Sequence, residues 1–246
     1  MGSEILAFGT LCLNGKHVYP GATYNGQLIQ IGTPIAGLRL YWYYTEGKLI
    51  ANRCFLSNIS WDSLNAQGLV YGKEVVIGAM RCRLRLLRGD VGELGEGELG
   101  EWEELVNAAG GPTYVMGDGI LSWGQNCEDD NENWPVAFKC TTGAWGGYYA
   151  SSEEENFGWR PVLEVISMES TALLGKTVIA TGAHGNQVSG LLESVTDYDL
   201  VLGGQVNVYR PDGQNHMFCG EIGQGKVAVN RQKLLLLEEI QEKEET

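Results

Sequence analysis

The sequence predicts an α+β fold in which many short strands and turns accompany a few short helices. Of the 246 residues, 35 are glycine and only 6 are proline, and 43% are hydrophobic, which is ample for a packed core. Apolar runs of strand length recur between turn residues along most of the chain, whereas helical spacing is confined to two stretches. Strands are therefore expected to be the main elements.

The first third of the chain contains several strand signals. Residues 1–36 alternate short apolar runs with Gly, Asn and Pro, which predicts a β-rich N-terminal arm, suited to packing on another subunit. Residues 38–44 and 48–52 flank a Glu-Gly turn and predict a hairpin. Residues 75–77 and 80–87 predict a second hairpin around a Gly-Ala turn.

Two short helices are expected. Ser60 is a suitable N-cap for a helix over residues 61–67, which ends at Gly68. In residues 101–109, Trp102, Leu105, Val106 and Ala109 follow one another at intervals of three, one and three residues, which is the spacing of one helix face.

Three arginines alternate with apolar residues in the second hairpin. Arg81, Arg83 and Arg85 would lie on one face of the strand, with Cys82 and Leu84 on the other. Such a row can bind an anion. The simpler interpretation is a solvated face that pairs with nearby glutamates.

Residues 157–165, FGWRPVLEV, predict a strand that closes a sheet. Gly158 and Pro161 do not allow a long helix here. We expect Trp159 and Leu163 to be buried and Arg160 to hold a polar group in place.

The C-terminal part has a different character. Between residues 172 and 240, β-like runs separated by Gly and Asn turns predict a separate small β-barrel, which resembles SH3- or Sm-like barrels. In a particle, such a barrel would serve docking or oligomerisation. Residues 241–246 form a charged tail.

The charge balance argues against several partners. The formal net charge is −14, so neither nucleic acid nor an anionic membrane surface is an expected partner. The sequence has neither the pattern of a signal peptide nor an apolar run long enough for a membrane helix. We therefore expect synthesis in a cytoplasm, with any extracellular role reached by lysis or as part of a particle.

The reactive residue types show no catalytic pattern. The six cysteines have no CxxC spacing; Cys127 and Cys140 can form a disulfide in an oxidising setting, and free buried thiols are the alternative. The three histidines have no metal-ligand spacing, and no GxSxG motif is present. No enzymatic activity is expected.

An oxygen-rich run at residues 128–133 is a candidate calcium site. Asp129, Asn131 and Asn133 carry the oxygen ligands that Ca²⁺ prefers. Trp134 stands where an EF-hand loop has glycine, and no glutamate closes the loop. A solvated acidic loop is the alternative, and no other cofactor is expected.

Residues 139–156 have the composition of a binding surface. Trp145, Tyr148 and Tyr149 lie among small polar residues and glycines. Aromatic anchors with adaptable polar neighbours suit protein recognition and sugar stacking. The alternative is a glycine-rich loop whose aromatic rings pack inward.

Several blocks occur in the order found in a known family. They are SWDSLNAQGLVYGK (residues 60–73), LRLL (84–87), a Gly-rich loop, Glu101-Trp102, Ser122-Trp123-x-Gln125, and FGWRPVLE (157–164). Over roughly residues 38–167 this set resembles C-type-lectin-fold proteins of the formylglycine-generating-enzyme type from Firmicutes and their phages. Variable proteins of diversity-generating retroelements and phage receptor binders use that fold.

The resemblance implies a C-type lectin-like domain at residues 37–168, between the N-terminal arm and the barrel. It also implies that the segment before the GWRP strand forms the ligand face, although Gly and Glu replace the family's basic residues there. The candidate ligand-binding residues are Trp123, Lys139, Thr141, Trp145, Tyr148, Tyr149, Ser151 and Glu153.

The resulting functional hypothesis is a non-enzymatic, tail-associated virion protein, a homo-oligomer attached to other virion proteins, that recognises a host-surface glycan or protein. One alternative is a structural decoration or spacer without a ligand. Another is an oxidase or hydrolase on the formylglycine-enzyme fold, for which no supporting motif surrounds Cys127 or Cys140.

Overall fold

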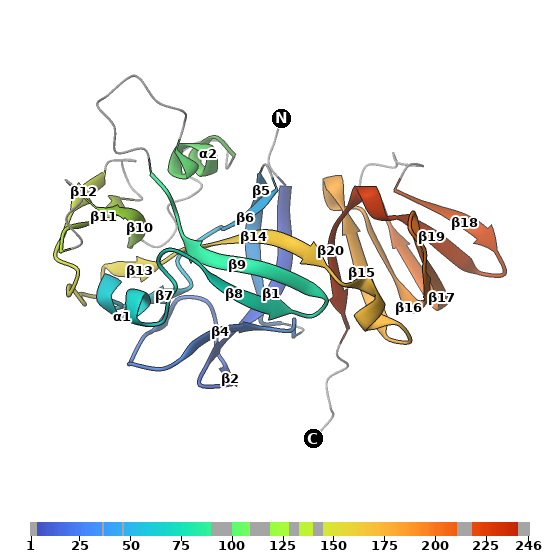
Figure 1. Cartoon of the computed structure of the whole chain (residues 1–246), viewed down its shortest axis with the longest axis horizontal. Helices are drawn as coiled ribbons and strands as arrows, with labels where there is room; N and C mark the ends of the chain where they lie inside the picture. Colours follow the sequence, from blue (N-terminus) through green and yellow to red (C-terminus); the bar gives the residue numbers. More distant parts are fainter. Residues whose placement is uncertain are drawn as a thin grey trace.

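The computed structural model describes residues 4–35, 37–45, 47–89, 100–108, 119–127, 133–139, 145–210 and 218–240. Three β-sheets lie in a row along the long axis of the molecule (Figure 1). Of the described residues, 56% lie in strands and 12% in helices.

The first sheet is the centre of the molecule. Its strand order is β2 (Lys16–His17), β1 (Glu4–Leu13), β5 (Arg39–Thr45), β6 (Lys48–Ala51), β14 (Pro161–Met168), β9 (Met80–Leu86) and β8 (Lys73–Ile77), with β4 (Ile29–Gly32) also paired to β1. All of its pairs are antiparallel. Both hairpins predicted from the sequence, β5–β6 and β8–β9, are confirmed.

The second sheet packs against the first. Its order is β12 (Trp145–Gly147), β11 (Pro135–Lys139), β10 (Leu121–Cys127), β13 (Phe157–Trp159), β7 (Leu56–Ser57) and β3 (Ala22–Thr23). Trp42 and Leu163 of the first sheet share one buried core with Trp123 and Trp159 of the second. This core fixes where the second sheet sits.

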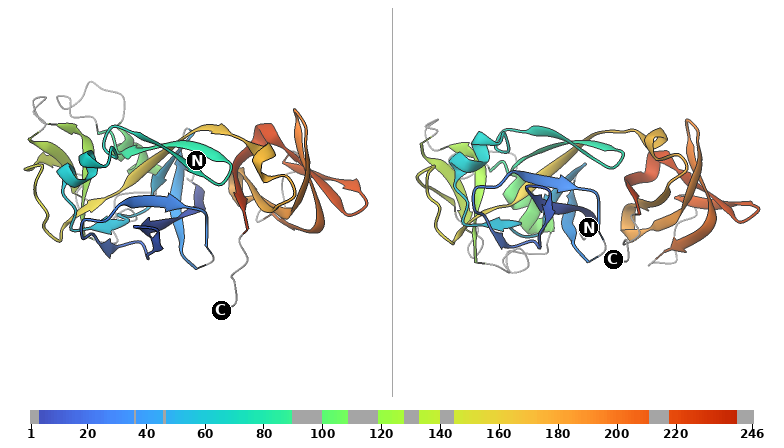
Figure 2. Two further views of the ribbon diagram at one scale, coloured as in Figure 1. Left: turned by 60° about the horizontal axis from the view of Figure 1, so that its bottom comes forward. Right: turned by 90° about the horizontal axis from the view of Figure 1, so that it is seen from below.

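The third sheet follows at the opposite end. Its order is β18 (Cys219–Gly223), β19 (Lys226–Asn230), β17 (Asp199–Tyr209), β16 (Gln187–Val195), β15 (Thr177–Gly182) and β20 (Leu234–Glu239). The sheet curls over its own apolar core (Figure 2). The described strands pair as an open sheet, without a pair between β18 and β20.

Helices are short and stand at the margins of the sheets. They are α1 (Trp61–Ala66), α2 (Glu101–Ala108) and the 3-10 turns η2 (Ser170–Leu173), η3 (Ala183–Gly185) and η4 (Arg231–Lys233). The Ser60 hydroxyl accepts a hydrogen bond from the Ser63 amide, so the predicted N-cap of α1 is confirmed. The α2 side chains Trp102 and Leu105 cover one face of the first sheet.

The predicted α+β class, with an N-terminal arm, a lectin-like domain and a small barrel, is wrong. The described chain is mostly β. The two α-helices span only six and eight residues, which is too short to form a layer. The segment expected to be an arm is integrated, since β1 pairs with β5 inside the first sheet.

The FGWRPVLEV segment contains two strands in place of the single one predicted. β13 belongs to the second sheet and β14 to the first, and the chain crosses between them at Arg160. Trp159 and Leu163 are fully buried, as expected. The Arg160 side chain donates to Ser122 Oγ (3.1 Å) and to the Asn52 carbonyl (3.2 Å), so it fastens the crossing point.

Gly158 lies where that crossing leaves no space for a side chain. A Cβ atom there would lie 2.5 Å from Ile120 Cγ2, 2.8 Å from the Leu56 carbonyl oxygen and 2.9 Å from Cys54 Sγ. We expect Gly158→Ala to lower the free energy of unfolding by about 1–3 kcal/mol, because the surrounding backbone must shift. Urea unfolding measures this change.

The control for this prediction is Gly220→Ala in the edge strand β18, where a Cβ atom meets nothing within 4 Å. Equal effects of the two substitutions would show that packing at Gly158 is not the cause.

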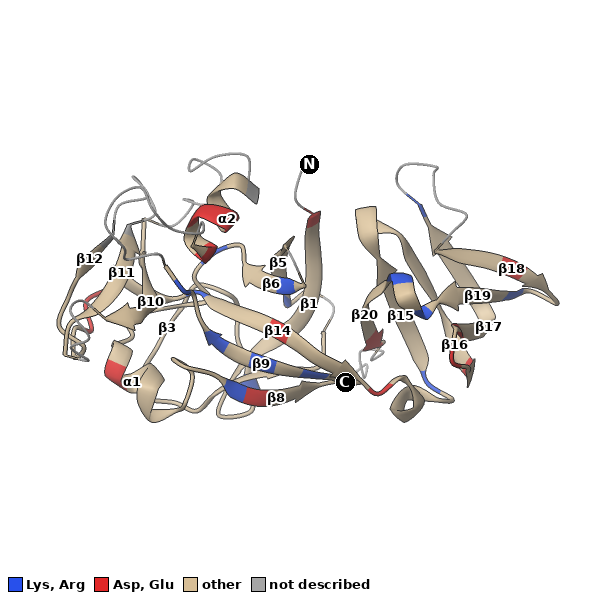
Figure 3. Cartoon of the chain, turned by 45° about the horizontal axis from the view of Figure 1, so that its top comes forward, with Lys and Arg blue, Asp and Glu red and all other residues tan. Residues whose placement is uncertain are grey.

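The arginine row of β9 is mostly paired with glutamates, as the simpler interpretation predicted. Arg81 lies 2.6 Å from Glu74, and Arg83 lies 3.9 Å from Glu164. Figure 3 shows this basic stretch along β8 and β9. The prediction that Arg85 is solvated is wrong, because its side chain is fully buried.

Arg85 is buried because Glu101, the first residue of α2, covers it. Its guanidinium donates to both oxygens of Glu101 (2.5 and 2.7 Å) and to Glu164 Oε1 (2.6 Å). Burial by itself would raise the pKa of Glu101, but the hydrogen bonds and charge of Arg85 hold the pKa below its ordinary value. Glu101 is therefore ionised in the folded protein.

The first and third sheets are joined by buried contacts through β20. Leu236 belongs to the core of the first two sheets, whereas Leu237 belongs to the core of the third. The β15–β20 register shifts between the pairs Thr181–Leu236 and Gly182–Leu234, which is a β-bulge at this point. Because successive side chains of a strand face opposite sides, the adjacent Leu236 and Leu237 enter different cores.

Polar contacts strengthen this junction. The Glu4 carboxylate of β1 accepts hydrogen bonds from the His184 and Gly185 amides of η3. Glu238 of β20 accepts one from the Gly9 amide of β1 (3.3 Å) and lies 3.8 Å from Arg39 of β5. The third sheet is thus fixed on the first.

Candidate ligand-binding surface

Two chain segments lie side by side at the outer end of the second sheet. β11 and β12 pair from Val136–Gly147 to Phe138–Trp145. Beyond this ladder the Tyr148 amide donates to the Pro135 carbonyl (3.0 Å), and the Ala150 amide donates to the Asn133 carbonyl (3.2 Å). These bonds hold residues 133–135 against residues 148–150.

This pairing places two aromatic rings together on the outside. The centroids of Trp134 and Tyr149 are 4.5 Å apart, with the ring planes tilted by 37°. Trp134 is 36% exposed and Tyr149 is 62% exposed. The pair is therefore an open apolar platform with a phenol hydroxyl and an indole N–H at its edges.

Tyr148 points the other way. Its ring contacts Phe157 edge to face at 5.1 Å and Trp123 at 6.5 Å. Because successive side chains of an extended segment face opposite sides, the inward Tyr148 fixes the outward direction of Tyr149. The aromatic platform thus stands on a buried aromatic cluster.

The segment after Tyr149 is also held in place. The Ser152 amide donates to the Tyr149 carbonyl (2.9 Å), which forms a turn. Ser60, the N-cap of α1, donates from its hydroxyl to Glu153 Oε1 (3.2 Å). Ser151 and Glu153 are exposed, so hydroxyl and carboxylate groups lie on the surface close to the platform in the chain.

The predicted ligand-binding residues differ in how far they are exposed at the surface. Tyr149, Ser151 and Glu153 lie on the surface, and Tyr148 is half-buried beneath it. Trp123 is fully buried, with its indole donating to the Ile59 carbonyl (2.7 Å) and its ring stacked on Phe157, so it supports the site from inside.

Other predicted residues are described only in part. The backbones of Lys139 and Trp145 pair in the second sheet, opposite Leu121 and Phe138 respectively. Thr141 lies outside the described residues.

The predicted calcium ligands are described only at Asn133, whose carbonyl accepts the Ala150 amide. Asp129 and Asn131 lie outside the described residues, as does Cys140 of the predicted disulfide. Elsewhere in the described chain, no group of three His, Cys, Asp or Glu side chains is placed to hold a metal ion.

Trp134 is the residue that sequence reasoning did not assign to the surface. In the sequence, Trp134 is notable only because it stands where an EF-hand loop has glycine. Trp134 is an aromatic residue directly before a strand. This position indicates a surface contact with Tyr149 only when the pairing of the two segments is known.

The buried thiols Cys12 and Cys82 have low reactivity. Burial raises the pKa of the Cys82 thiol to about 12 and also raises the pKa of Cys12. Since the thiolate is the reactive form, these two side chains are poor nucleophiles. Cys54 is fully buried, 3.3 Å from Ser122 Oγ.

Comparisons with protein-family models, curated proteins and solved structures found no match to the chain.

The helices of the described segments are all too short or too polar to cross a membrane.

Proposed function

We propose that the protein is a non-enzymatic ligand-binding protein of a phage or phage-like particle, and that it presents the Trp134–Tyr149 platform to a host-surface glycan. The observation that carries the proposal is this exposed aromatic pair, held by backbone hydrogen bonds on a buried aromatic support. The net charge of −14, which does not suit nucleic acid or an anionic membrane as a partner, is compatible with this setting.

The geometry suits a sugar ring. Apolar C–H faces of a sugar stack on aromatic rings, and its hydroxyls need donors and acceptors at the margin. Ser151 supplies a hydroxyl, and Glu153 supplies a carboxylate that Ser60 holds in position. Because the site is small and open, single-site binding is weak, and copies on one particle would multiply it by avidity.

Removing both rings is expected to weaken recognition strongly. In the double variant Trp134→Ala and Tyr149→Ala, affinity should fall roughly tenfold or more, because the aromatic anchors of a binding site contribute most of its energy. Binding is measured on an array of bacterial surface polysaccharides, and titration calorimetry with the best-bound polysaccharide gives the affinity.

Tyr198→Ala is the matched control, since Tyr198 is 73% exposed but lies between β16 and β17 of the third sheet, away from the platform. It should bind like the wild type. If the wild-type chain binds no polysaccharide on the array, or if the double variant binds as well as Tyr198→Ala, the platform is not a glycan site. A structural spacer is then the better description.

A further inference from the structure

A second candidate site lies at the junction of the first and third sheets, away from the aromatic platform. The cavity there has a volume of about 500 Å³, within the roughly 300–1,000 Å³ typical of small-molecule sites. Its lining residues come from both sheets and from the turns that connect their strands.

The walls of this cavity are held in place before any ligand arrives. Met168 packs against both apolar cores, Leu235 packs against the core of the first two sheets, and Leu234 packs against the core of the third. The Glu169 amide, next to Met168, donates to the Ala79 carbonyl (2.8 Å). A ligand would therefore enter a largely pre-formed site.

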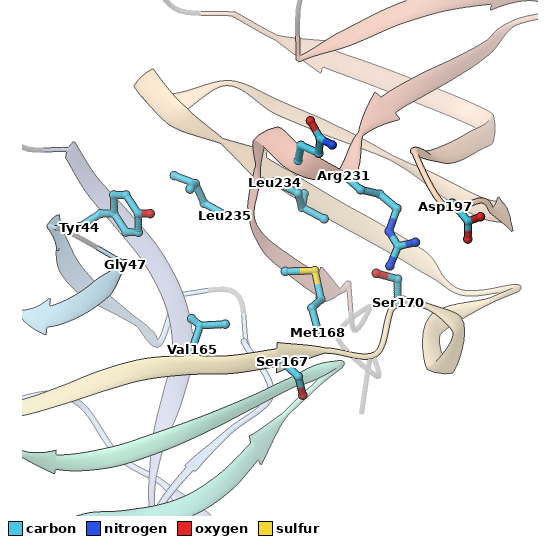
Figure 4. Close-up of a pocket in the computed structure, with 11 residues that line it drawn as sticks. Tyr44, Gly47, Val165, Ser167, Met168, Ser170, Asp197, Arg231, Leu234 and Leu235 are labelled. Carbon is cyan, nitrogen blue, oxygen red and sulfur yellow. The ribbon is translucent and has the colours of Figure 1, made fainter.

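The cavity changes from apolar to polar along its length (Figure 4). Tyr44 and Val165 stand at one end, and Met168 and Leu235 lie between the two ends. Ser170, Arg231 and Asp197 stand at the other end. This gradient matches a linear ligand with an apolar body and one polar terminus.

The polar end has donors to offer. One guanidinium nitrogen of Arg231, Nη1, donates to the Thr196 carbonyl (2.6 Å), and within the described chain no carboxylate lies within 4.0 Å of the guanidinium. The Ser170 hydroxyl is buried, in a residue that is 2% exposed, and has no hydrogen-bond partner among the described residues. A buried hydroxyl without a partner is costly, so a ligand acceptor there would be favourable.

We propose that this cavity binds a linear apolar monocarboxylate. The carboxylate would accept hydrogen bonds from the Arg231 guanidinium and the Ser170 hydroxyl, and the apolar chain would lie on Met168 and Leu235. The exposed Asp197 carboxylate at the same end opposes a ligand with several negative charges. The carboxylate belongs either to a free fatty acid or to the C-terminus of a peptide with apolar last residues.

Paired probes test the proposal and separate the two sources. Calorimetry compares decanoate with decanamide, and N-acetyl-Leu-Leu with its C-terminal amide. In at least one pair the acid should bind roughly tenfold or more tightly than the amide, because the charge-assisted hydrogen bonds are lost with the charge. A preference for decanoate identifies a fatty acid as the ligand, and a preference for N-acetyl-Leu-Leu identifies a peptide C-terminus.

Variants connect this binding to the cavity. Arg231→Gln should remove most of the preference for the acid, and Ser170→Ala should weaken acid binding. Lys233→Gln is the matched control, because it removes a positive charge from the same turn at an exposed residue that does not line the cavity. It should bind like the wild type.

A measurement on the wild-type protein avoids any folding defect of the variants. The methyl resonance of Met168 should shift when the bound acid is added. The proposal is overturned if neither acid binds, if acid and amide bind equally, if Arg231→Gln binds like Lys233→Gln, or if the Met168 resonance does not move.

Discussion

Replacing Glu101 by alanine is expected to lower the free energy of unfolding by roughly 3–5 kcal/mol, because it leaves the Arg85 guanidinium buried without its main partner. Arg85 is fully buried and donates to both oxygens of Glu101. The partners that remain are the Leu86 carbonyl and Glu164, and Glu164 is 27% exposed and also lies near Arg83. Urea unfolding measures this change in free energy, because urea is uncharged and does not screen the ion pair.

The matched control removes an ion pair on the surface. Glu74→Ala breaks the 2.6 Å contact with Arg81, in which both side chains are 53% exposed. Its cost should stay below about 1 kcal/mol, because water stabilises the separated charges. Comparable losses in the two variants would mean that burial does not decide the strength of the Arg85 network. The attachment of α2 to the first sheet would then come from its apolar side chains, Trp102 and Leu105, and not from Glu101.

Replacing Glu238 by glutamine is expected to stabilise the protein above neutral pH. Burial raises the pKa of Glu238 to about 7 from 4.5, and the charge of Arg39 and the Gly9 amide offset only part of this effect. The folded state therefore holds the proton more tightly than the unfolded state. The stability that Glu238 contributes through this proton is fully present below pH 4.5 and is lost as the pH rises through 7.

The size of this effect follows from the pKa difference. A shift from 4.5 to about 7 corresponds to roughly 3 kcal/mol at pH 8. Glutamine does not ionise and can still accept the Gly9 amide, so Glu238→Gln should match the wild type near pH 4.5 and exceed it at pH 8. Urea unfolding at several pH values gives the difference between the two proteins.

Glu221→Gln in the exposed strand β18 serves as the control for the loss of one negative charge. It should follow the wild-type pH profile. A Glu238→Gln profile parallel to the wild type would show that Glu238 ionises as easily in the folded protein as in the unfolded chain.

Features with local causes could be predicted from the sequence. The Ser60 cap of α1 and the β8–β9 hairpin depend on residues that are neighbours in the chain. The burial of Trp159 and Leu163 followed from their size and from strand alternation. Alternation failed at Arg85, because the partner that buries it, Glu101, comes from another element.

Features that depend on distant pairing could not be predicted. Nothing in residues 4–13 indicates that β1 pairs with β5, so the arm was predicted in place of a sheet strand. The platform was predicted only at Tyr149, because the position of Trp134 depends on the hydrogen bonds between residues 133–135 and 148–150. The cavity between the first and third sheets requires knowledge of how the sheets meet.

The position of β20 has a consequence for how the protein is made. Every other described strand leaves the ribosome before β20, yet Leu236 and Leu237 complete both apolar cores. Until this strand arrives, the nascent chain carries two unfinished cores and the unpaired edge of β15. Unpaired strand edges and exposed apolar surface favour aggregation, so we expect the nascent chain to be most prone to aggregation before β20 is in place.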